Sequence, residues 1–255
     1  MLGPAADTYA AVFDSRCAAG GDSGAQRVDG PGVRGLVSFD AASQTQLLVL
    51  DDQAFNVLDA VLPLASPGTI RVCQTARRCA ELLQQDARWS AKPVTAMVCH
   101  DLRTVPEPSL PAGLSLRAVR RVPDDPPGGV PLIDAVTAAE GAAAPRDVIV
   151  DDLVTYLTSL PTGSRIFAAV DGDGMVRGTS ASRTLLTDAY VFFVNTDPDW
   201  RRRGVGLSMT AAALRSAVST GARRASLDAS GPGVALYRRL GFTAGAEMTQ
   251  FSRTD

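Results

Sequence analysis

Residues 200–206 read Trp-Arg-Arg-Arg-Gly-Val-Gly (WRRRGVG), and a long helical pattern rich in alanine and leucine follows them directly. An Arg-x-x-Gly-x-Gly loop that enters a helix combines free backbone N–H groups, the positive end of the helix dipole and arginine charge. Glycines in such a loop let the backbone approach phosphate oxygens closely, because they have no Cβ. The stretch therefore predicts a seat for a phosphorylated ligand.

Two well-known phosphate-binding patterns do not fit this loop. A Gly-x-Gly-x-x-Gly dinucleotide motif needs a glycine at position 209, where Met209 stands. The Gly-x-x-x-x-Gly-Lys-Ser/Thr pattern is also absent. Taken alone, the loop is compatible with a plain helix N-terminus, a solvated arginine patch or a nucleic-acid contact, so the flanking sequence has to decide.

Composition narrows the class of protein. Of 255 residues, 45% are hydrophobic and 20% are charged, which predicts a packed globular core. The net charge of −2 argues against a dedicated nucleic-acid binder. No apolar run approaches the roughly 20 residues of a membrane span, and the N-terminus lacks the pattern of a signal peptide. We therefore expect a cytoplasmic protein, monomeric or homodimeric, that binds neither nucleic acid nor membrane.

Cysteine and histidine usage disfavours several kinds of site. The four cysteines form no C-x-x-C pair, and His100 is the only histidine. Zinc sites and disulfide frameworks are therefore not expected, and we predict no metal. A single histidine also removes most Ser-His-Asp and Cys-His schemes of nucleophilic catalysis.

A proline-rich segment divides the chain into two predicted domains. The segment TVPEPSLP at 104–111 predicts a boundary near residue 110, which gives domains 1–110 and 111–255. In the second domain, hydrophobic periodicity predicts the order β-αα-βββ-α-β-α-β, with an Asp-Gly hairpin turn at 171–174. This order indicates an α/β (α+β) fold with a mixed central sheet and helices on both faces.

The chain also shows a faint internal repeat. Residues 46–99 and 189–251 share the order strand, helix, strand, helix, strand with similar spacing. Asp51 and Asp52 stand in the first copy where the second has its arginines, and carboxylates there would repel phosphate. The N-terminal half is then a structural copy without the seat, although chance similarity explains two such runs equally well.

Three segments together resemble the GNAT (Gcn5-related) N-acetyltransferase superfamily. They are Val191–Thr196 (VFFVNT), the loop Arg201–Gly206, and Leu227–Ser230 (LDAS) followed by Leu236–Phe242 (LYRRLGF). The resemblance covers roughly residues 114–252, and the combination is specific although each motif alone is not. It implies a GNAT-type sheet, acetyl-CoA as the cofactor and a smaller, degenerate GNAT-like domain in the N-terminal half.

The resemblance also implies a set of cofactor-binding residues. Backbone groups of Val194, Asn195 and Thr196, at a splayed strand end, would pair with the pantetheine arm. The pyrophosphate would be held by the loop and the first turn of the following helix, which comprise Arg201, Arg202, Arg203, Gly204, Val205, Gly206 and Leu207, with a hydroxyl from Ser208. Ser230 stands where many relatives have an asparagine that contacts the cofactor, and its reach is shorter.

Tyr237 is the candidate catalytic residue. When an amine attacks the thioester, a backbone N–H of Val194 or Asn195 would stabilise the oxyanion, and a phenol can donate a proton to the leaving thiolate. The competing interpretation is that Tyr237 only packs a helix against the sheet.

The general base is not identified by the sequence. Some relatives carry a glutamate on the strand before the splay, where this chain has Tyr190, and a phenol with a pKa of about 10 is a poor base at neutral pH. Glu140, Asp188 and Glu247 are candidates, and each also fits a solvated surface carboxylate.

Acceptor specificity is expected from residues 132–160, from the hairpin at 171–174 and from the final strands, since loops commonly carry recognition. Acidic residues in this part, Glu140, Asp151 and Asp152, would suit a cationic amine or could be solvated or cap a helix.

The leading hypothesis is transfer of an acetyl group from acetyl-CoA to a primary amine of a small molecule or protein, by direct attack in a ternary complex. One alternative is a different acyl-CoA donor. Another is a CoA-binding regulatory module that has lost turnover.

Overall fold

A computed structural model describes residues 9–11, 13, 25–38, 45–66, 68–120, 129–132, 134–135 and 164–253. The chain divides into two units. The first comprises residues 1–98, 228–235 and 243–255, and the second comprises residues 99–227 and 236–242. In the described residues, no helix is long and apolar enough to span a membrane.

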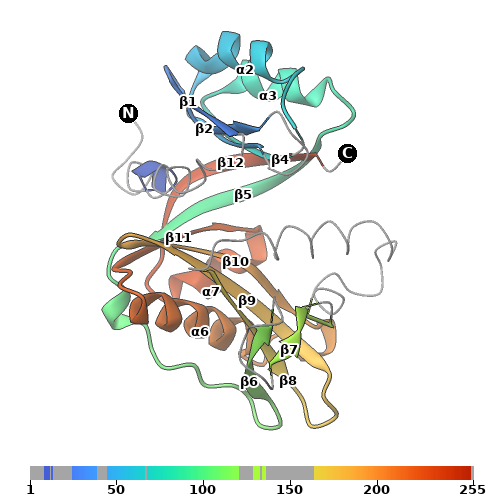
Figure 1. Ribbon diagram of the computed structural model, residues 1–255, viewed down its shortest axis with the longest axis vertical. Coiled ribbons are helices and arrows are strands. Elements are labelled where there is room, and N and C mark those ends of the chain that lie inside the picture. Colours follow the sequence, from blue (N-terminus) through green and yellow to red (C-terminus); the bar gives the residue numbers. More distant parts are fainter. Residues whose placement is uncertain are drawn as a thin grey trace. The chain divides into compact units, whose positions relative to one another are not determined.

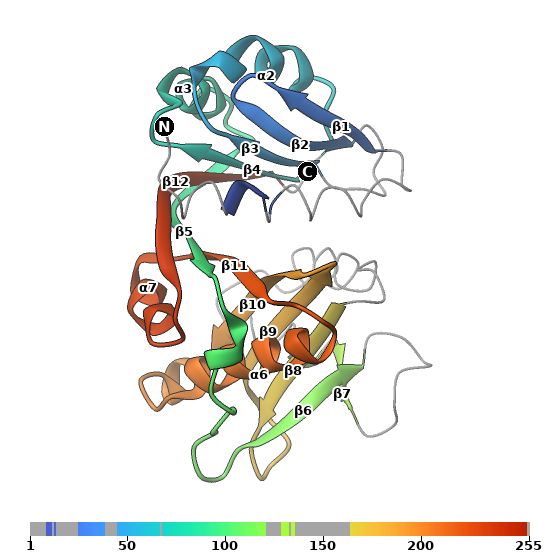
Figure 2. The same cartoon turned by 90° about the vertical axis from the view of Figure 1, so that its left-hand side faces the viewer.

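The first unit is built on a mixed sheet. Across it the strands follow the order β1 (Ala25–Gly30), β2 (Val33–Ser38), β3 (Thr45–Val49), β4 (Gly68–Cys73), β12 (Thr243–Arg253) and β5 (Ser90–Cys99). Helices η1 (Asp52–Ala54), α2 (Phe55–Val61) and α3 (Arg77–Gln84) connect the strands, and α2 and α3 lie on one face of the sheet (Figures 1 and 2). Leu58 of α2 and Leu83 of α3 are fully buried against this face, as the apolar side of an amphipathic helix requires.

The C-terminal strand completes the first unit. β12 lies between β4 and β5 and is antiparallel to both, with Phe251 opposite Ile70 in β4 and Ala91 in β5. The sequence had assigned this strand to the domain 111–255, with a boundary near residue 110, whereas the second unit begins at Cys99. Alternating burial identifies a strand but does not name its partner, because any free sheet edge can accept it.

The second unit also has a mixed run of paired strands. Across it the strands follow the order β11 (Arg224–Ala229), β10 (Asp188–Thr196), β9 (Val176–Leu185), β8 (Ser164–Val170), β6 (Ser115–Arg120) and β7 (Val130–Pro131). The remaining elements are η2 (Leu102–Thr104), η3 (Pro198–Trp200), α6 (Val205–Ser219) and α7 (Gly231–Arg238). The last two residues of β11 and the first five of α7 belong to the first unit.

The sequence-based fold class is confirmed. The strand pairing is mixed, and the hairpin turn is present between β8 and β9, where the Gly174 N–H donates to the Asp171 carbonyl at 3.1 Å. The two helices predicted between residues 132 and 160 fall almost entirely outside the described residues.

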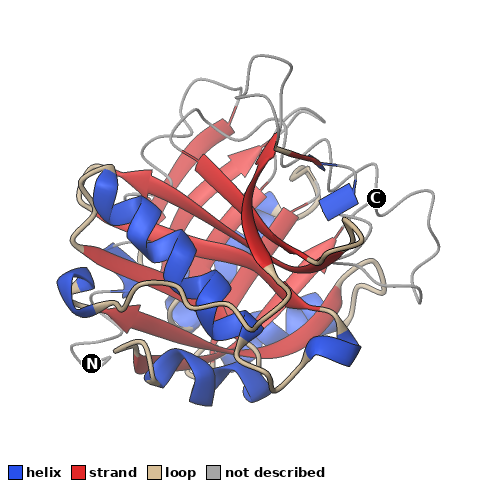
Figure 3. Cartoon of the chain, turned by 90° about the horizontal axis from the view of Figure 1, so that it is seen from below, coloured by secondary structure: helices blue, strands red, loops and turns tan. Residues whose placement is uncertain are grey.

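Helix α6 packs on β8, β9 and β10 and crosses one face of the sheet as the long helix at the front of Figure 3. Its alanine-rich sequence suits this position, because small side chains let a helix approach a sheet closely. The Ser180 hydroxyl of β9 donates to the Met209 carbonyl at 2.7 Å. Gly178, also on β9, leaves room for the start of the helix, since a Cβ there would stand 2.7 Å from Cγ1 of Val205.

Gly178→Val is expected to destabilise the second unit by about 1–3 kcal/mol, because the added side chain overpacks the contact between β9 and α6. Urea unfolding should show a lower midpoint with an unchanged slope. Gly172→Val is the control, since a Cβ at Gly172 meets nothing within 4 Å. Equal midpoints for the two variants would show that α6 does not need this close approach.

Candidate active site

The neighbouring strands β10 and β11 separate part-way along their length. They pair in parallel only from Asp188 to Tyr190 on β10 and from Arg224 to Ser226 on β11. From Val191 onward, β10 has no register partner in β11. Backbone groups on this side of β10 are therefore not paired with β11, and an extended ligand that reached them could bind like an added strand.

A β-bulge interrupts β10 just beyond the separation. The register with β9 shifts between Phe192 and Asn195, so that Phe193 and Val194 have no register partner in β9. Phe193 adopts a positive φ of 55°, and the Thr179 hydroxyl donates to its carbonyl at 2.9 Å. Bulges re-aim backbone groups next to sites, and this one turns the Phe193–Val194 peptide out of the regular ladder.

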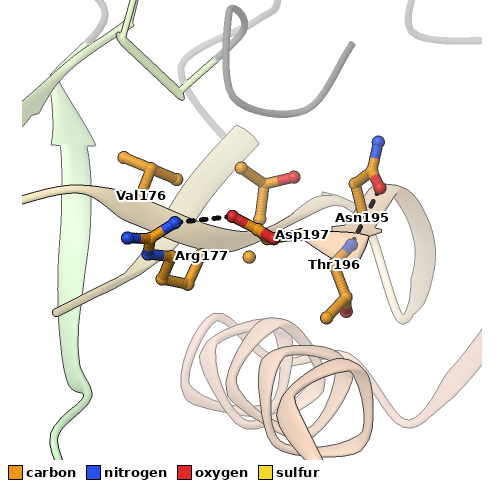
Figure 4. Close-up of a pocket in the computed structure, with 7 residues that line it drawn as sticks. Val176, Arg177, Asn195, Thr196 and Asp197 are labelled. Atoms are coloured by element: carbon orange, nitrogen blue, oxygen red, sulfur yellow. Dashed lines mark hydrogen bonds and ion pairs between the residues drawn. The ribbon is translucent and has the colours of Figure 1, made fainter. Parts of the chain in front are cut away.

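Asn195 and Thr196 end the strand and help to line a shallow surface hollow (Figure 4). The Thr196 N–H donates to Asn195 Oδ1 at 2.8 Å, and the Thr196 carbonyl accepts a bond from Arg201 Nε at 3.2 Å. Three residues were predicted to pair with a pantetheine arm. Of these, Val194 lies in the bulge. The N–H and the carbonyl of Thr196 both already have hydrogen-bond partners.

The arginine-glycine loop joins η3 to α6 and is exposed from Arg201 to Gly204. Arg202 and Gly204 both have positive φ, 58° and 89°. The Arg203 guanidinium lies over the Trp200 ring, 5.2 Å from its centroid. The first helical hydrogen bond of α6 runs from the Ser208 N–H to the Gly204 carbonyl at 3.0 Å, so the N–H groups of the preceding turn are left for a ligand or water.

The two glycines of this loop are required for different reasons. Gly204 adopts a left-handed conformation in open space, where a Cβ would meet nothing within 4 Å. Gly206 is crowded instead, because a Cβ there would stand 3.1 Å from Leu236 and 3.2 Å from Thr196. From the sequence, both glycines were expected to allow close approach to phosphate. The structure adds that Gly204 is needed for its backbone conformation and that Gly206 is needed for packing.

Ser208 was predicted to offer its hydroxyl to the cofactor. The structure buries this side chain, and its hydroxyl donates to the carbonyl of Ser109. It can serve a phosphate only by giving up that bond.

The sequence of this part of the chain matches a known domain family. The model of the acetyltransferase (GNAT) domain fits residues 162–244, which include β8 to β11, the loop, α6 and α7. The family model thus places an acetyltransferase (GNAT) domain at residues 162–244.

Solved structures extend the likeness to the whole chain. A GCN5-related N-acetyltransferase from Kribbella flavida is 17% identical with a TM-score of 0.59, over 100% of this chain and 97% of that one. A tandem GNAT protein from the clavulanic acid biosynthesis pathway is 15% identical with a TM-score of 0.53, over 98% and 95%. A GCN5-related N-acetyltransferase-like protein from Streptococcus suis is 12% identical with a TM-score of 0.57, over 94% and 92%. These likenesses show the fold; no curated protein matches the sequence.

The N-terminal half repeats the GNAT order of elements without its opening. β3 pairs in parallel with β4 along its whole length, from Thr45 to Val49. Asp51 caps η1 by accepting the Gln53 N–H, and Oδ1 of Asp52 accepts the Cys79 N–H at 3.2 Å. In the N-terminal half, a closed strand pair and two carboxylates therefore stand at the positions where the predicted repeat would place the opening and the arginines.

Tyr237 of the GNAT domain is buried, with 8% of its surface exposed, and its ring meets Phe242 edge-on at 6.0 Å. Burial, together with the neighbouring phenol of Tyr190, raises the pKa of Tyr237 to about 12. The phenol therefore stays protonated at neutral pH and can act as a proton donor but not as a base.

The remaining sequence candidates are dispersed. Asp188, at the start of β10, is held by Arg224 through two bonds of 2.8 and 3.0 Å. Glu247 is exposed on β12 in the first unit, where it accepts the Thr95 hydroxyl at 3.0 Å. Ser230 is exposed between β11 and α7 and also belongs to the first unit, while Glu140 lies outside the described residues.

A charged triad at the base of the loop was not predicted. Arg177 of β9 binds Asp171 of the hairpin at 2.7 Å and Asp197, which caps η3, at 2.8 Å; Figure 4 shows the second contact. The ion pair with Arg177 lowers the pKa of Asp171. Partial burial works to raise the pKa of Asp197, but Arg177 and the Asp199 N–H outweigh it and the pKa is lowered. The Asp-Gly turn was visible in the sequence, but its arginine partner was not.

The triad should make stability depend on pH. In the folded state the pKa values of Asp171 and Asp197 lie below the ordinary carboxyl value of 3.8. The two ion pairs therefore stabilise the fold fully above pH 3.8, and this stabilisation is lost as the pH falls through the lowered pKa values of the two aspartates. Arg177→Met should therefore unfold in less urea than the wild type from about pH 5 to pH 8, and the difference should shrink below about pH 4. A difference that stays constant down to the lowest pH would contradict this role of the triad.

Proposed function

We propose that the protein transfers an acetyl group from acetyl-CoA to a primary amine of a small molecule or protein, by direct attack in a ternary complex. The observation that carries the proposal is the parting of β10 and β11 after Tyr190, beside the uncapped first turn of α6, within a GNAT domain. The opening offers strand-like backbone partners, and the helix end offers N–H groups and positive charge. Both fit the extended arm and the phosphates of CoA.

In this proposal, different groups of the chain bind the phosphates and the pantetheine arm of CoA. The N–H groups from Arg202 to Leu207 hold the pyrophosphate, with Arg201 and Arg203 supplying charge. The backbone of β10 beyond Val191 aligns the pantetheine arm. When bound, acetyl-CoA supplies an activated acetyl group as a thioester.

Two groups then act on the reaction. The Val194 N–H, set free from the ladder by the bulge, stabilises the negative charge that develops on the carbonyl oxygen. As the C–N bond forms and the C–S bond breaks, the nitrogen would give up one proton to water, while Tyr237 would give its proton to the sulfur and regain one from water. This division needs no histidine.

The test combines binding with turnover. CoA in hundredfold excess over its Kd should stabilise the chain by about 2.7 kcal/mol, and acetyl-CoA with an accepted amine should release free thiol. Absence of any CoA-dependent thermal shift would overturn the proposal. Binding without thiol release from any amine would favour the regulatory module, and faster release from succinyl- or propionyl-CoA would favour another acyl donor.

A further inference from the structure

The outermost strand of the first unit has one edge that no other described strand pairs with. β1 stands at the end of the strand order, and its only partner among the described strands is β2 (Figures 1 and 2). Gln26, Arg27 and Asp29 of β1 are exposed. An edge of this kind presents N–H and C=O groups in a row, which a further strand can extend.

The hairpin between β1 and β2 determines which residues of β1 direct their backbone groups to that edge. A two-residue turn joins the strands, so the pair that closes it, Gly30 and Val33, is hydrogen-bonded. Backbone bonding alternates along an antiparallel strand. Val28 therefore bonds to β2, and the backbone groups of Arg27 and Asp29 point away from it.

The side chains of β1 divide between the two faces of the sheet. Val28 packs on the core beneath α2 and is half-buried. Arg27 and Asp29 therefore lie on the opposite face, where 45% and 62% of their side-chain surfaces are exposed. Arg27 Nη2 lies 3.7 Å from Asp29 Oδ2 in the same strand. Charges of opposite sign thus stand on either side of Val28.

Apolar surface reaches the same edge on the helix side of the sheet. A Cβ at Gly30 would lie 3.9 Å from Val57 of α2, so this helix covers β1. Val57 and Val61, which share a side of α2, are only half-buried, as is Val28. A further strand and helix that continued the sheet would remove this apolar surface from water.

We propose that a second copy of this chain docks on the edge of β1, with the two β1 strands antiparallel about a two-fold axis at Val28. Arg27 of each copy then lies opposite the partner's Asp29, and their backbone groups meet as a hydrogen-bonded pair. The two Val28 side chains meet on the helix side. Arg27 has several N–H donors, so it keeps its contact with Asp29 of its own strand and also binds the partner's Asp29.

The charges of β1 select this register over its neighbours. An axis placed at Arg27 would set the two Arg27 side chains opposite each other, and an axis at Asp29 would do the same to the two aspartates. Like charges directly opposite in a sheet are destabilising, whereas opposite charges are stabilising. Only the axis at Val28 satisfies both charges and both faces.

The first test is sedimentation equilibrium of the full chain, which we expect to be dimeric. Arg27→Asp and Asp29→Arg should each weaken the dimer at least about tenfold, because like charges then stand opposite each other. An equimolar mixture of these two variants should form a heterodimer, since one copy offers two aspartates and the other two arginines. Arg103→Asp is the control, because it breaks another exposed pair of residues two positions apart, with Asp101, and should leave the dimer unchanged.

Charged residues on an edge strand can instead prevent association, and Arg27→Ala separates the two roles. The proposed dimer predicts weaker association of this variant, whereas charges that protect the edge predict stronger association. A wild type that stays monomeric would overturn the proposal. Dimerisation of Arg27→Asp and Asp29→Arg as tight as that of the wild type would also overturn it, because the contact would then lie elsewhere.

The second test is a disulfide across the two-fold axis. Val28 faces its own copy at a non-hydrogen-bonded position, where Cα atoms of antiparallel strands lie about 4.5 Å apart, within reach of a disulfide. Val28→Cys in a Cys17→Ala background should form a covalent dimer on mild oxidation, because the cysteines in the described part of the chain are buried. Gln26→Cys, on the same face but opposite the partner's Gly30, should not. Equal cross-linking of both variants, or of neither, would overturn the register.

Discussion

Tyr237→Phe is expected to lower kcat by about a hundredfold or more while leaving the affinity for CoA unchanged. The variant keeps the buried ring and its edge contact with Phe242, and it removes only the hydroxyl. Without a proton donor, the thiolate leaves as a free anion in a buried site, which raises the barrier to C–S cleavage. Steady-state thiol release and calorimetric titration with CoA separate the two effects.

The control removes a buried phenol that the mechanism does not use. Tyr9 has 2% of its surface exposed and donates its hydroxyl to Asp228 in the first unit. Tyr9→Phe should lower stability without a hundredfold effect on kcat. Because the pKa of Tyr237 is about 12, its loss of a proton should not limit the wild-type rate below about pH 11. Full activity of Tyr237→Phe would show that the residue only packs α7.

The phosphate loop was predictable because its signals are local. Arginines, two glycines and the start of a helix lie within seven residues, and backbone geometry links them directly. The amino-acid sequence alone did not show why each of the two glycines is needed. The positive φ of Gly204 is a local property, but the crowding at Gly206 comes from Leu236, thirty positions along the chain.

The splay itself was expected from the resemblance alone. Its extent depends on the register between β10 and β11, which stops after Tyr190 and Ser226. Register is determined by how side chains of distant strands pack, and hydrophobic periodicity within one strand does not encode it. For the same reason, the sequence did not predict the pairing of β12 with β4 or the ion pairs of Arg177 with Asp171 and Asp197.

Comparison of the two halves explains why a single seat is expected in each chain. The sequence pointed to this through Asp51 and Asp52, by charge alone. The structure adds that β3 is paired with β4 from end to end, so no backbone edge is open between them. Replacing the two aspartates by arginine would therefore change the charge without creating a place for the pantetheine arm.

Gly204→Val is expected to weaken CoA binding by about a hundredfold or more, because hydrogen bonds from N–H groups to a charged partner are worth about 1.5–3 kcal/mol each. Gly204 has a φ of 89°, which a β-branched residue adopts only at a cost of about 1–3 kcal/mol. Open space around the residue rules out a clash as the cause. The backbone should relax to a negative φ, and the first turn of α6 then no longer presents its N–H groups together.

Gly221→Val provides the matched control at the other end of the same helix. Gly221 has a φ of 99°, and a Cβ there would also meet nothing within 4 Å. The two variants should therefore lose similar stability in urea, while only Gly204→Val loses affinity for CoA in a calorimetric titration. If both bind CoA like the wild type, the anion seat is not at the start of α6. If both lose affinity equally, the effect comes from α6 as a whole, because the strain at Gly221 lies about fifteen residues from the loop.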